Sequence, residues 1–232
     1  MNSWHAIAAL NNAEWCDLIC RSHGARTRFD DVAWTSPTRT PPYYPDAVTL
    51  VPDLSIPDLL ARIDSSIGCS IKDSFASLNL TGQGFRVLFD AQWIVCPNTR
   101  WRANLVAPDW ELVRDREDIA RWVEAWRAEA GPTDVFRADV LDHDSVAVLA
   151  ARSDDRIVAG AIATRTSNVV GISNFFAEEG ITSASWSGCL AFARSLFSTS
   201  IFVGYESGDE LAAAQRAGFQ IAGPLRVWIR ED

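Results

Sequence analysis

The sequence predicts an α/β fold in which a central mixed sheet is flanked by helices and the first half is a truncated version of the second. Segments with strand and helix patterns alternate along the 232 residues, and 48% hydrophobic with 22% charged residues is typical of a globular chain. The stretch QGFRVLFDAQWI at 83–94 has a near-copy, AGFQIAGPLRVWI, at 217–229. One architecture is therefore expected twice, as domains at 1–100 and 101–232.

The composition excludes several classes of protein. A net charge of −9 argues against binding to nucleic acid or to an anionic membrane, which needs clustered positive charge. The N-terminus lacks a basic flank and a continuous apolar stretch, and the longest apolar runs, at 146–151 and 157–163, are too short to span a bilayer. We therefore expect a cytoplasmic protein whose five cysteines are free thiols.

The first half contains turn and cap residues that delimit its elements. Gly24 ends a helix, four prolines between Pro37 and Pro45 impose extended backbone, and Ser55 is an N-cap followed by Pro57. The predicted elements are a helix at 10–23, a loop at 26–45, a strand at 46–51, a helix at 55–66, a strand at 68–74, a short helix at 75–80 and one or two strands at 83–94. The strand–helix–strand unit implies a parallel pair.

The second half has a longer series of elements. Ile119, Trp122 and Val123 follow helical spacing, and turn residues near Asp154 and Ser167 separate three strands. The predicted elements are a strand at 110–115, a helix at 116–131, three strands within 145–178, a helix at 182–197, a strand at 200–206, a helix at 207–218 and closing strands.

The two halves share their endings. The helix at 207–218 opens with Ser207-x-x-Glu210, a capping box, and closes on Gly218. Gly-Phe follows at 218–219 as it does at 84–85, and Trp-Ile comes next in both halves at spacings that differ by one residue. A turn or a bulge must absorb that difference, because a one-residue slip exchanges the faces of a strand.

The element order of 110–232 resembles the GNAT superfamily of N-acetyltransferases. The hairpin DDRIVAGAIATR and the ending AAAQRAGFQIAGPLRVWI are similar to the corresponding parts of that family, and residues 46–96 match it in part. The arrangement is similar to that of tandem two-domain members. This resemblance implies acetyl-CoA as the cofactor and an amine of a small molecule or peptide as the acceptor.

The family binds the pyrophosphate of acetyl-CoA on a Q/R-x-x-G-x-G/A loop, and the sequence departs from it there. The junction reads FFAEEGITSASW at 175–186, which keeps only Gly180 and places Glu178 and Glu179 where neutral or positive residues occur. The carboxylates oppose a pyrophosphate, although the helix N-terminus still offers N–H groups. The resemblance assigns cofactor binding to Phe175, Phe176, Ala177, Gly180, Ile181, Thr182 and Ser183.

The family's frequent catalytic tyrosine is also missing, since its position falls on Ala214, and on Leu80 in the first half. Glu178 and Tyr205, at the ends of the fourth and fifth strands, are the catalytic candidates, with Glu206 beside them. A carboxylate can accept the proton of an attacking amine. The alternative is that these are solvated residues at strand ends.

Two further groups were considered as sites. Trp34, Tyr43 and Tyr44 in the proline-rich loop are predicted to bind the substrate, unless this loop is a rigid connector packed on the sheet. Cys16, Cys20 and His23 share one face of the first helix and could hold zinc. Buried cysteines behave as small apolar residues, however, so no metal is predicted.

Three functions are compatible with these residues. The first is an acyltransferase that uses Glu178 as its base and the backbone around residues 174–177 for the pantetheine. The second is a scaffold that has lost catalysis and binds a small ligand. The third is a module that binds a partner protein through the aromatic loop. The first is preferred because the element order of the second half is complete.

Overall fold

The structure is a computed structural model that describes residues 3–97, 109–127, 131–197 and 201–231. The chain divides into two compact units, called unit 1 (residues 1–93 and 222–232) and unit 2 (residues 94–221). The boundary predicted from the sequence near residue 100 lies outside the described residues. The last strand belongs to unit 1, whereas the sequence placed it in the second domain.

Unit 1 has a mixed sheet. Its elements are α1 (Trp4–Ser22), β1 (Arg28–Phe29), β2 (Ala33–Thr35), β3 (Ala47–Thr49), α2 (Ile56–Leu60), β4 (Ser70–Asp73), the 3-10 helix η1 (Thr81–Gln83), most of β5 (Phe85–Cys96) and most of β11 (Gln220–Arg230). The strand order is β1-β2-β3-β4-β11-β5. The predicted parallel pair is confirmed, because β3 pairs parallel with β4. Antiparallel pairing of 226–229 with β4 holds the last strand in this unit.

Helix α1 begins earlier than predicted because Ser3 is its N-cap and accepts a hydrogen bond from the backbone N–H of Ala6. One side of the helix is buried. There Asn12 accepts a hydrogen bond of 2.8 Å from the ammonium of Lys72, the only lysine of the chain. A buried amide thus satisfies a buried charge.

Three sequence predictions for this unit are wrong in detail. The segment predicted as a loop at 26–45 begins with β1 and β2, and α2 ends well before residue 66. Residues 75–80 form a turn and a bend followed by irregular backbone rather than a helix. The carboxylate of Asp73 accepts hydrogen bonds from the N–H groups of Phe75 and Leu78, and Ala76 adopts a φ of 50°. Such side-chain bonds compete with helix formation.

Unit 2 follows the predicted order closely. Its elements are β6 (Asp109–Leu112), α3 (Arg116–Trp126), η3 (Ala138–Asp142), β7 (Val146–Ser153), β8 (Arg156–Thr166), β9 (Val169–Ala177), α4 (Thr182–Leu196), β10 (Phe202–Glu206) and α5 (Gly208–Arg216). The strands run in the order β10-β9-β8-β7-β6. The predicted turns are confirmed, with Asp154 and Ser167 at φ values of 53° and 50°.

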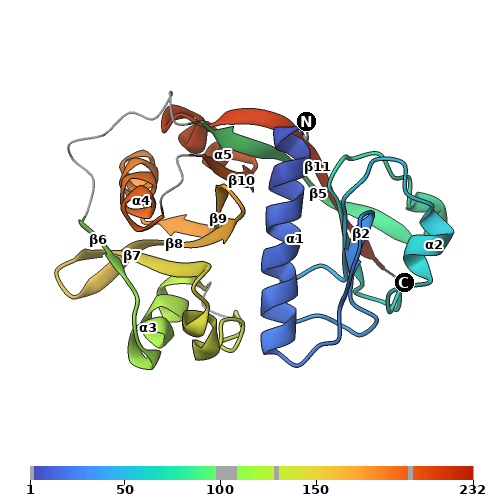
Figure 1. Cartoon of the computed structure of the whole chain (residues 1–232), viewed down its shortest axis with the longest axis horizontal. Helices are drawn as coiled ribbons and strands as arrows, with labels where there is room; N and C mark the ends of the chain where they lie inside the picture. Colours follow the sequence, from blue (N-terminus) through green and yellow to red (C-terminus); the bar gives the residue numbers. More distant parts are fainter. Residues whose placement is uncertain (1–2, 98–108, 128–130, 198–200, 232) are drawn as a thin grey trace. The chain divides into compact units, whose positions relative to one another are not determined.

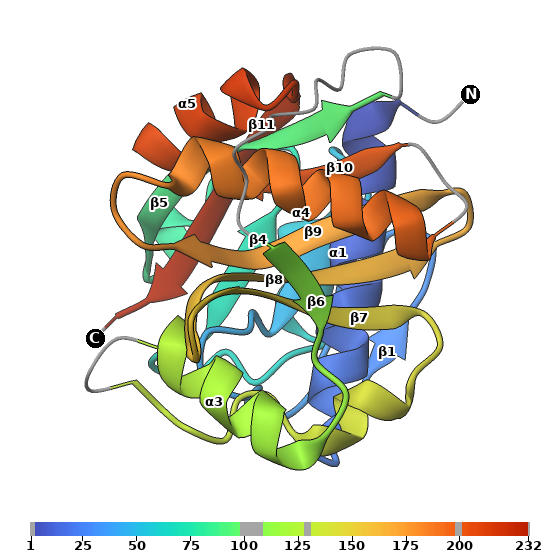
Figure 2. The same cartoon turned by 90° about the vertical axis from the view of Figure 1, so that its left-hand side faces the viewer.

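Helices α4 and α3 lie on opposite faces of the sheet of unit 2 (Figures 1 and 2). The α4 face is built from alternate residues of β7, β8 and β9, such as Leu149, Ala161 and Ile172, which pack with Trp186 of α4. On the other face Trp122 of α3 lies against Phe176 with ring centroids 5.3 Å apart. Small residues on the strands leave room for large aromatic residues on the helices.

The repeated endings adopt the same local structure. Gly84 and Gly218 have left-handed φ values of 80° and 112°. The next N–H groups, of Phe85 and Phe219, donate to the carbonyls of Leu80 and Ala214, the two positions where the family has its tyrosine. The capping box at Ser207 is not formed as predicted, since its side chain makes no cap bond and Gly208 follows with a φ of 52°.

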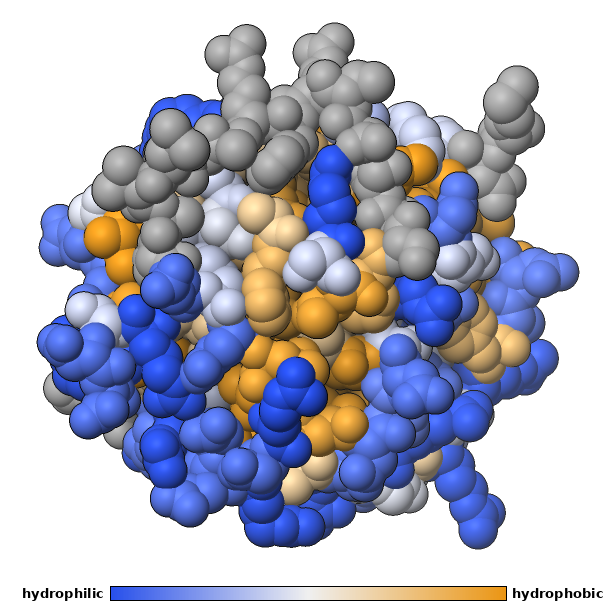
Figure 3. All heavy atoms as spheres, turned by 60° about the vertical axis from the view of Figure 1, so that its left-hand side comes forward, coloured by the Kyte–Doolittle hydropathy of each residue, from blue (hydrophilic) through white to orange (hydrophobic). Residues whose placement is uncertain are grey.

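The surface combines negative charge with local apolar areas. Figure 3 shows one face on which apolar side chains gather, with polar side chains beside and among them. Tyr43 and Ile67 are among the large apolar residues that are exposed. Among the described helices, none has the length and hydropathy that a membrane span requires.

The close packing of Trp122 on the sheet depends on Gly160. A Cβ at this residue would lie 2.4 Å from Phe176 and 2.5 Å from the indole nitrogen of Trp122, which donates to the carbonyl of Leu149. We expect Gly160→Ala to lower the free energy of unfolding by about 1–3 kcal/mol, measured by denaturant titration. Gly82→Ala is the control, because a Cβ there meets nothing within 4 Å. If the two variants have the same free energy of unfolding, the close packing of Trp122 at Gly160 does not contribute to stability.

Candidate functional site

The parallel ladder between β9 and β10 is short. It pairs Phe202 with Val170 and Val203 with Gly171, while β9 continues to Ala177 and β10 to Glu206. At its end a Cβ on Gly204 would lie 2.7 Å from the carbonyl oxygen of Ile172, so only glycine permits this approach. Past this point the two strands are no longer paired with each other.

A bulge in β9 lies next to the end of the ladder. The register of β8 with β9 shifts between Gly160 and Ile162, and Asn174 on the bulged strand has a left-handed φ of 51°. Its side-chain amide donates to the hydroxyl of Ser173. A bulge leaves one residue unpaired and changes the direction of the side chains that follow, and bulges are frequent beside active sites.

The two phenylalanines after the bulge point to opposite faces of the sheet. Phe175 stacks on Trp186 of α4, with ring centroids 4.0 Å apart and an interplanar angle of 15°. Phe176 makes an edge contact with Trp122 of α3. Both side chains are half-buried in packing. The rings of these two predicted cofactor-binding residues are therefore used in packing, which leaves their backbone groups as the parts that would contact a ligand.

The first turn of α4 follows directly. Ile181 is the N-cap and makes no side-chain cap bond, and Gly180 before it has a left-handed φ of 88° with open space at its Cβ position. The N–H groups of Thr182 and Ser183, at the start of the helix, have no partner within it. Together with the positive end of the helix dipole they suit an anion.

The charges around this helix start differ from what the sequence suggested. The carboxylate of Glu178 forms an ion pair of 2.7 Å with Arg156, so much of its repulsion on an anion is neutralised. Arg216, in the last turn of α5, donates through Nε to the hydroxyl of Ser183 at 3.0 Å. The loop motif cannot predict this cation, because Arg216 lies far from the loop in the sequence and only the fold brings the two together.

The end of β10 carries the other candidates. Tyr205 and Glu206 are both half-buried, and Glu210 lies in the first turn of α5. Burial raises the pKa of Glu206 to about 8, and the charge of Glu210 adds to the rise. A carboxyl group that exchanges its proton near neutral pH is suited to accept one from an ammonium group. Ala214 and Leu80 are fully buried and contribute no acid.

The predicted substrate-binding aromatics belong to unit 1. Trp34 is completely buried, and its indole nitrogen donates to Asp17 at 2.8 Å, so its ring is part of the core. Tyr44 is buried, whereas Tyr43 is 67% exposed. The loop is anchored by buried Asp46, which accepts hydrogen bonds from Arg39, Thr40 and Ser70. These contacts fit the alternative of a rigid connector, in which Tyr43 is the exposed one of the three aromatic residues.

The cysteine candidates are buried. Cys16 donates to the side chain of Asn12, and burial raises the pKa of its thiol to about 11 and that of Cys20 as well. Reactive cysteines have lowered values instead. Across the described ranges, no group of three His, Cys, Asp or Glu residues is placed to hold a metal ion.

Comparisons with known proteins find the fold but no close relative. No family model and no curated protein matches the sequence. Among solved structures, the chain is similar to a GCN5-related N-acetyltransferase from Kribbella flavida, with a TM-score of 0.62 and 14% identity over 97% of this chain and 96% of that one. An acetyltransferase of the GNAT family from Novosphingobium aromaticivorans gives a TM-score of 0.56 and 11% identity over 97% and 99% of the two chains.

A more distant similarity reaches the N-myristoyltransferase of Saccharomyces cerevisiae, whose structure contains bound myristoyl-CoA. Its TM-score is 0.51 with 9% identity, and it covers 71% of this chain and 51% of that one. The TM-scores support a common architecture, but sequence identities this low say nothing of the chemistry, which is argued from the residues of the site. The chain therefore shares its fold with the GNAT-family N-acetyltransferase structures to which it is similar.

Proposed function

We propose that unit 2 binds an acyl-CoA, acetyl-CoA in the first instance, and transfers the acyl group to an amine of a small molecule or peptide. The observation that carries this proposal is the short β9–β10 ladder with the left-handed bulge at Asn174 beside it. That arrangement leaves backbone groups of 174–177 outside the ladder, where they would hydrogen-bond the pantetheine amides and stabilise a developing oxyanion.

The phosphates of the donor would lie at the first turn of α4. Gly180 leaves space for them, the N–H groups of Thr182 and Ser183 donate, and Arg216 supplies the positive charge that the loop lacks. Glu178 remains close by but is paired with Arg156. These contacts support donor binding despite the degenerate loop.

The proton of the amine needs an acceptor, and Glu206 fits this role better than Glu178. Glu178 is exposed, and its carboxylate is occupied in the ion pair with Arg156. The raised pKa of Glu206 makes it a stronger base at the end of β10. Tyr205, beside it, is kept as a candidate acid for the leaving thiolate.

The alternative is a scaffold that binds a ligand without turnover. The observation that favours it is Ala214, a fully buried alanine where the family has its tyrosine. Binding of acetyl-CoA with no acyl product from a broad panel of amines would support this alternative. A partner-binding role of the proline-rich loop would rest on Tyr43, its exposed aromatic residue.

Acetyl-CoA is expected to raise the melting temperature in a saturable manner. A ligand at about one hundred times its dissociation constant adds roughly 2.7 kcal/mol to stability, a shift of a few degrees at this size. Arg216→Gln should weaken binding about tenfold, since a charge-assisted hydrogen bond is lost. The control is Arg121→Gln, whose exposed arginine pairs with Glu117 on α3. No shift in the native protein would refute donor binding, and an unchanged affinity of Arg216→Gln would refute only the role of Arg216.

The titration of Glu206 predicts a pH dependence of stability. Its pKa is about 8 in the folded protein against an ordinary value of 4.5. Between these values the unfolded chain has released a proton that the folded chain retains, so stability falls as the pH rises from about 4.5 to 8. Glu206→Gln should remove about 1–2 kcal/mol of this fall, after allowance for solvent screening.

The measurement is denaturant unfolding at pH 5 and at pH 8.5. Glu179→Gln, an exposed carboxylate at the start of α4, is the matched control and should follow the native protein. If the native protein and Glu206→Gln lose equal stability between the two pH values, the carboxyl group is not held protonated by burial.

A further inference from the structure

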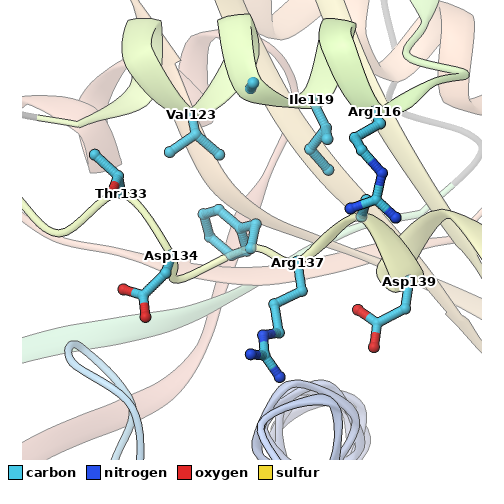
Figure 4. A pocket seen from close by; sticks show the side chains of 10 residues that line it. Arg116, Ile119, Val123, Thr133, Asp134, Arg137 and Asp139 are labelled. Carbon is cyan, nitrogen blue, oxygen red and sulfur yellow. The ribbon is translucent and has the colours of Figure 1, made fainter.

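Unit 2 contains a pocket that the proposed acyl transfer does not use. It is a cavity of about 470 Å³ between α3 and residues 133–139, open to solvent (Figure 4). Cavities of this size commonly bind small ligands. Ile119 and Val123 point into it from α3 (Figure 4).

The floor of the pocket is apolar and firmly held. Ile119, Val123 and Phe136 are each less than 5% exposed. The ring of Phe136 makes edge contacts with Trp122 and Trp126, at centroid distances of 5.5 and 4.8 Å. The pocket therefore presents a rigid apolar surface, which costs little to organise when a ligand binds.

The rim carries exposed charges that lack protein partners. Within the parts of the chain that the structure describes, the side chains of Arg116, Asp134 and Asp139 have no ion pair or hydrogen bond. Their neighbours on α3 do, since Arg121 pairs with Glu117 and Asp118. Arg116 is positive, and Asp134 and Asp139 are negative, so the unpaired groups of the rim include both signs. Such a rim favours a ligand that carries both charges over a simple anion or cation.

The charges are spread along the length of the pocket. Figure 4 shows Arg116 and Asp139 at one end, and Thr133 and Asp134 at the other, near Val123. From residue 116 to residue 123, α3 rises about 10 Å. An extended peptide spans about 3.3–3.6 Å per residue, so three residues match this length.

We infer that this pocket binds a short peptide of about three residues through its free termini. The carboxylate of the peptide pairs with Arg116 and its ammonium group pairs with Asp134. A central apolar side chain lies on Ile119, Val123 and Phe136, and Asp139 accepts a peptide N–H. This inference goes beyond the proposed acyl transfer and does not depend on it.

The test is calorimetric titration of the whole protein with the tripeptide Gly-Leu-Gly, in the absence of any acyl-CoA. Arg116→Gln should weaken binding about threefold, as should amidation of the peptide's carboxyl end, because each removes one partner of an exposed ion pair. Asp134→Asn and acetylation of the amino end should act in the same way. Arg114→Gln, an exposed arginine outside the pocket, should leave the affinity unchanged.

The pairing is decided by combining each variant with the modified peptide. If Arg116 holds the carboxylate, Arg116→Gln causes no further loss for the amidated peptide, while it still weakens the acetylated one. No binding of Gly-Leu-Gly by the native protein would overturn the inference. The inference would also be overturned if Arg116→Gln lowered the affinity for the free peptide and for the amidated peptide by the same factor. Because no acyl-CoA is present, binding in this titration supports the pocket alone and leaves the proposed enzyme activity to its own test.

Discussion

The bulge at Asn174 is the constraint on which the rest of unit 2 depends. One residue in the left-handed region shifts the pairing of β9 with β8, and the next two phenylalanines alternate between the two faces of the sheet. Phe175 then fixes α4 through Trp186, and Phe176 fixes α3 through Trp122. The same distortion leaves backbone groups beside β10 outside the ladder. Contacts to both helix layers and the candidate site therefore meet in one short segment of β9.

The electrostatics of the site are assembled from separate elements. A family-like loop would carry its cation and its N–H groups within a few consecutive residues. Here the N–H groups come from α4, the cation comes from α5 through Arg216, and Arg156 of β8 neutralises Glu178. Such a site is invisible to a motif search, because none of these contacts has a fixed spacing in the sequence.

The sequence was sufficient where local signals agreed with tertiary packing. The strands of 145–178 were found because their turn residues, Asp154 and Ser167, adopt the positive φ that such turns need. The prediction from sequence failed where a side chain accepts hydrogen bonds from backbone N–H groups that a helix would use, as the carboxylate of Asp73 does at 75–80. It also could not distinguish a buried aromatic residue from an exposed one, so Trp34 of the core and Tyr43 of the surface were grouped together. Burial, ion pairs and raised pKa values depend on neighbours that are distant in sequence.

The course of two strands has a consequence for how the chain acquires its structure. β5 begins in unit 1 and ends in unit 2, and β11 begins in unit 2 and ends in unit 1. Unit 1 thus receives a strand, paired with β4 through residues 226–229, that is synthesised after all of unit 2. On the ribosome, the native partner of this edge of β4 is absent until unit 2 has been translated. A strand edge without its partner can associate with other chains, so unit 1 depends on the last residues of the chain to protect it.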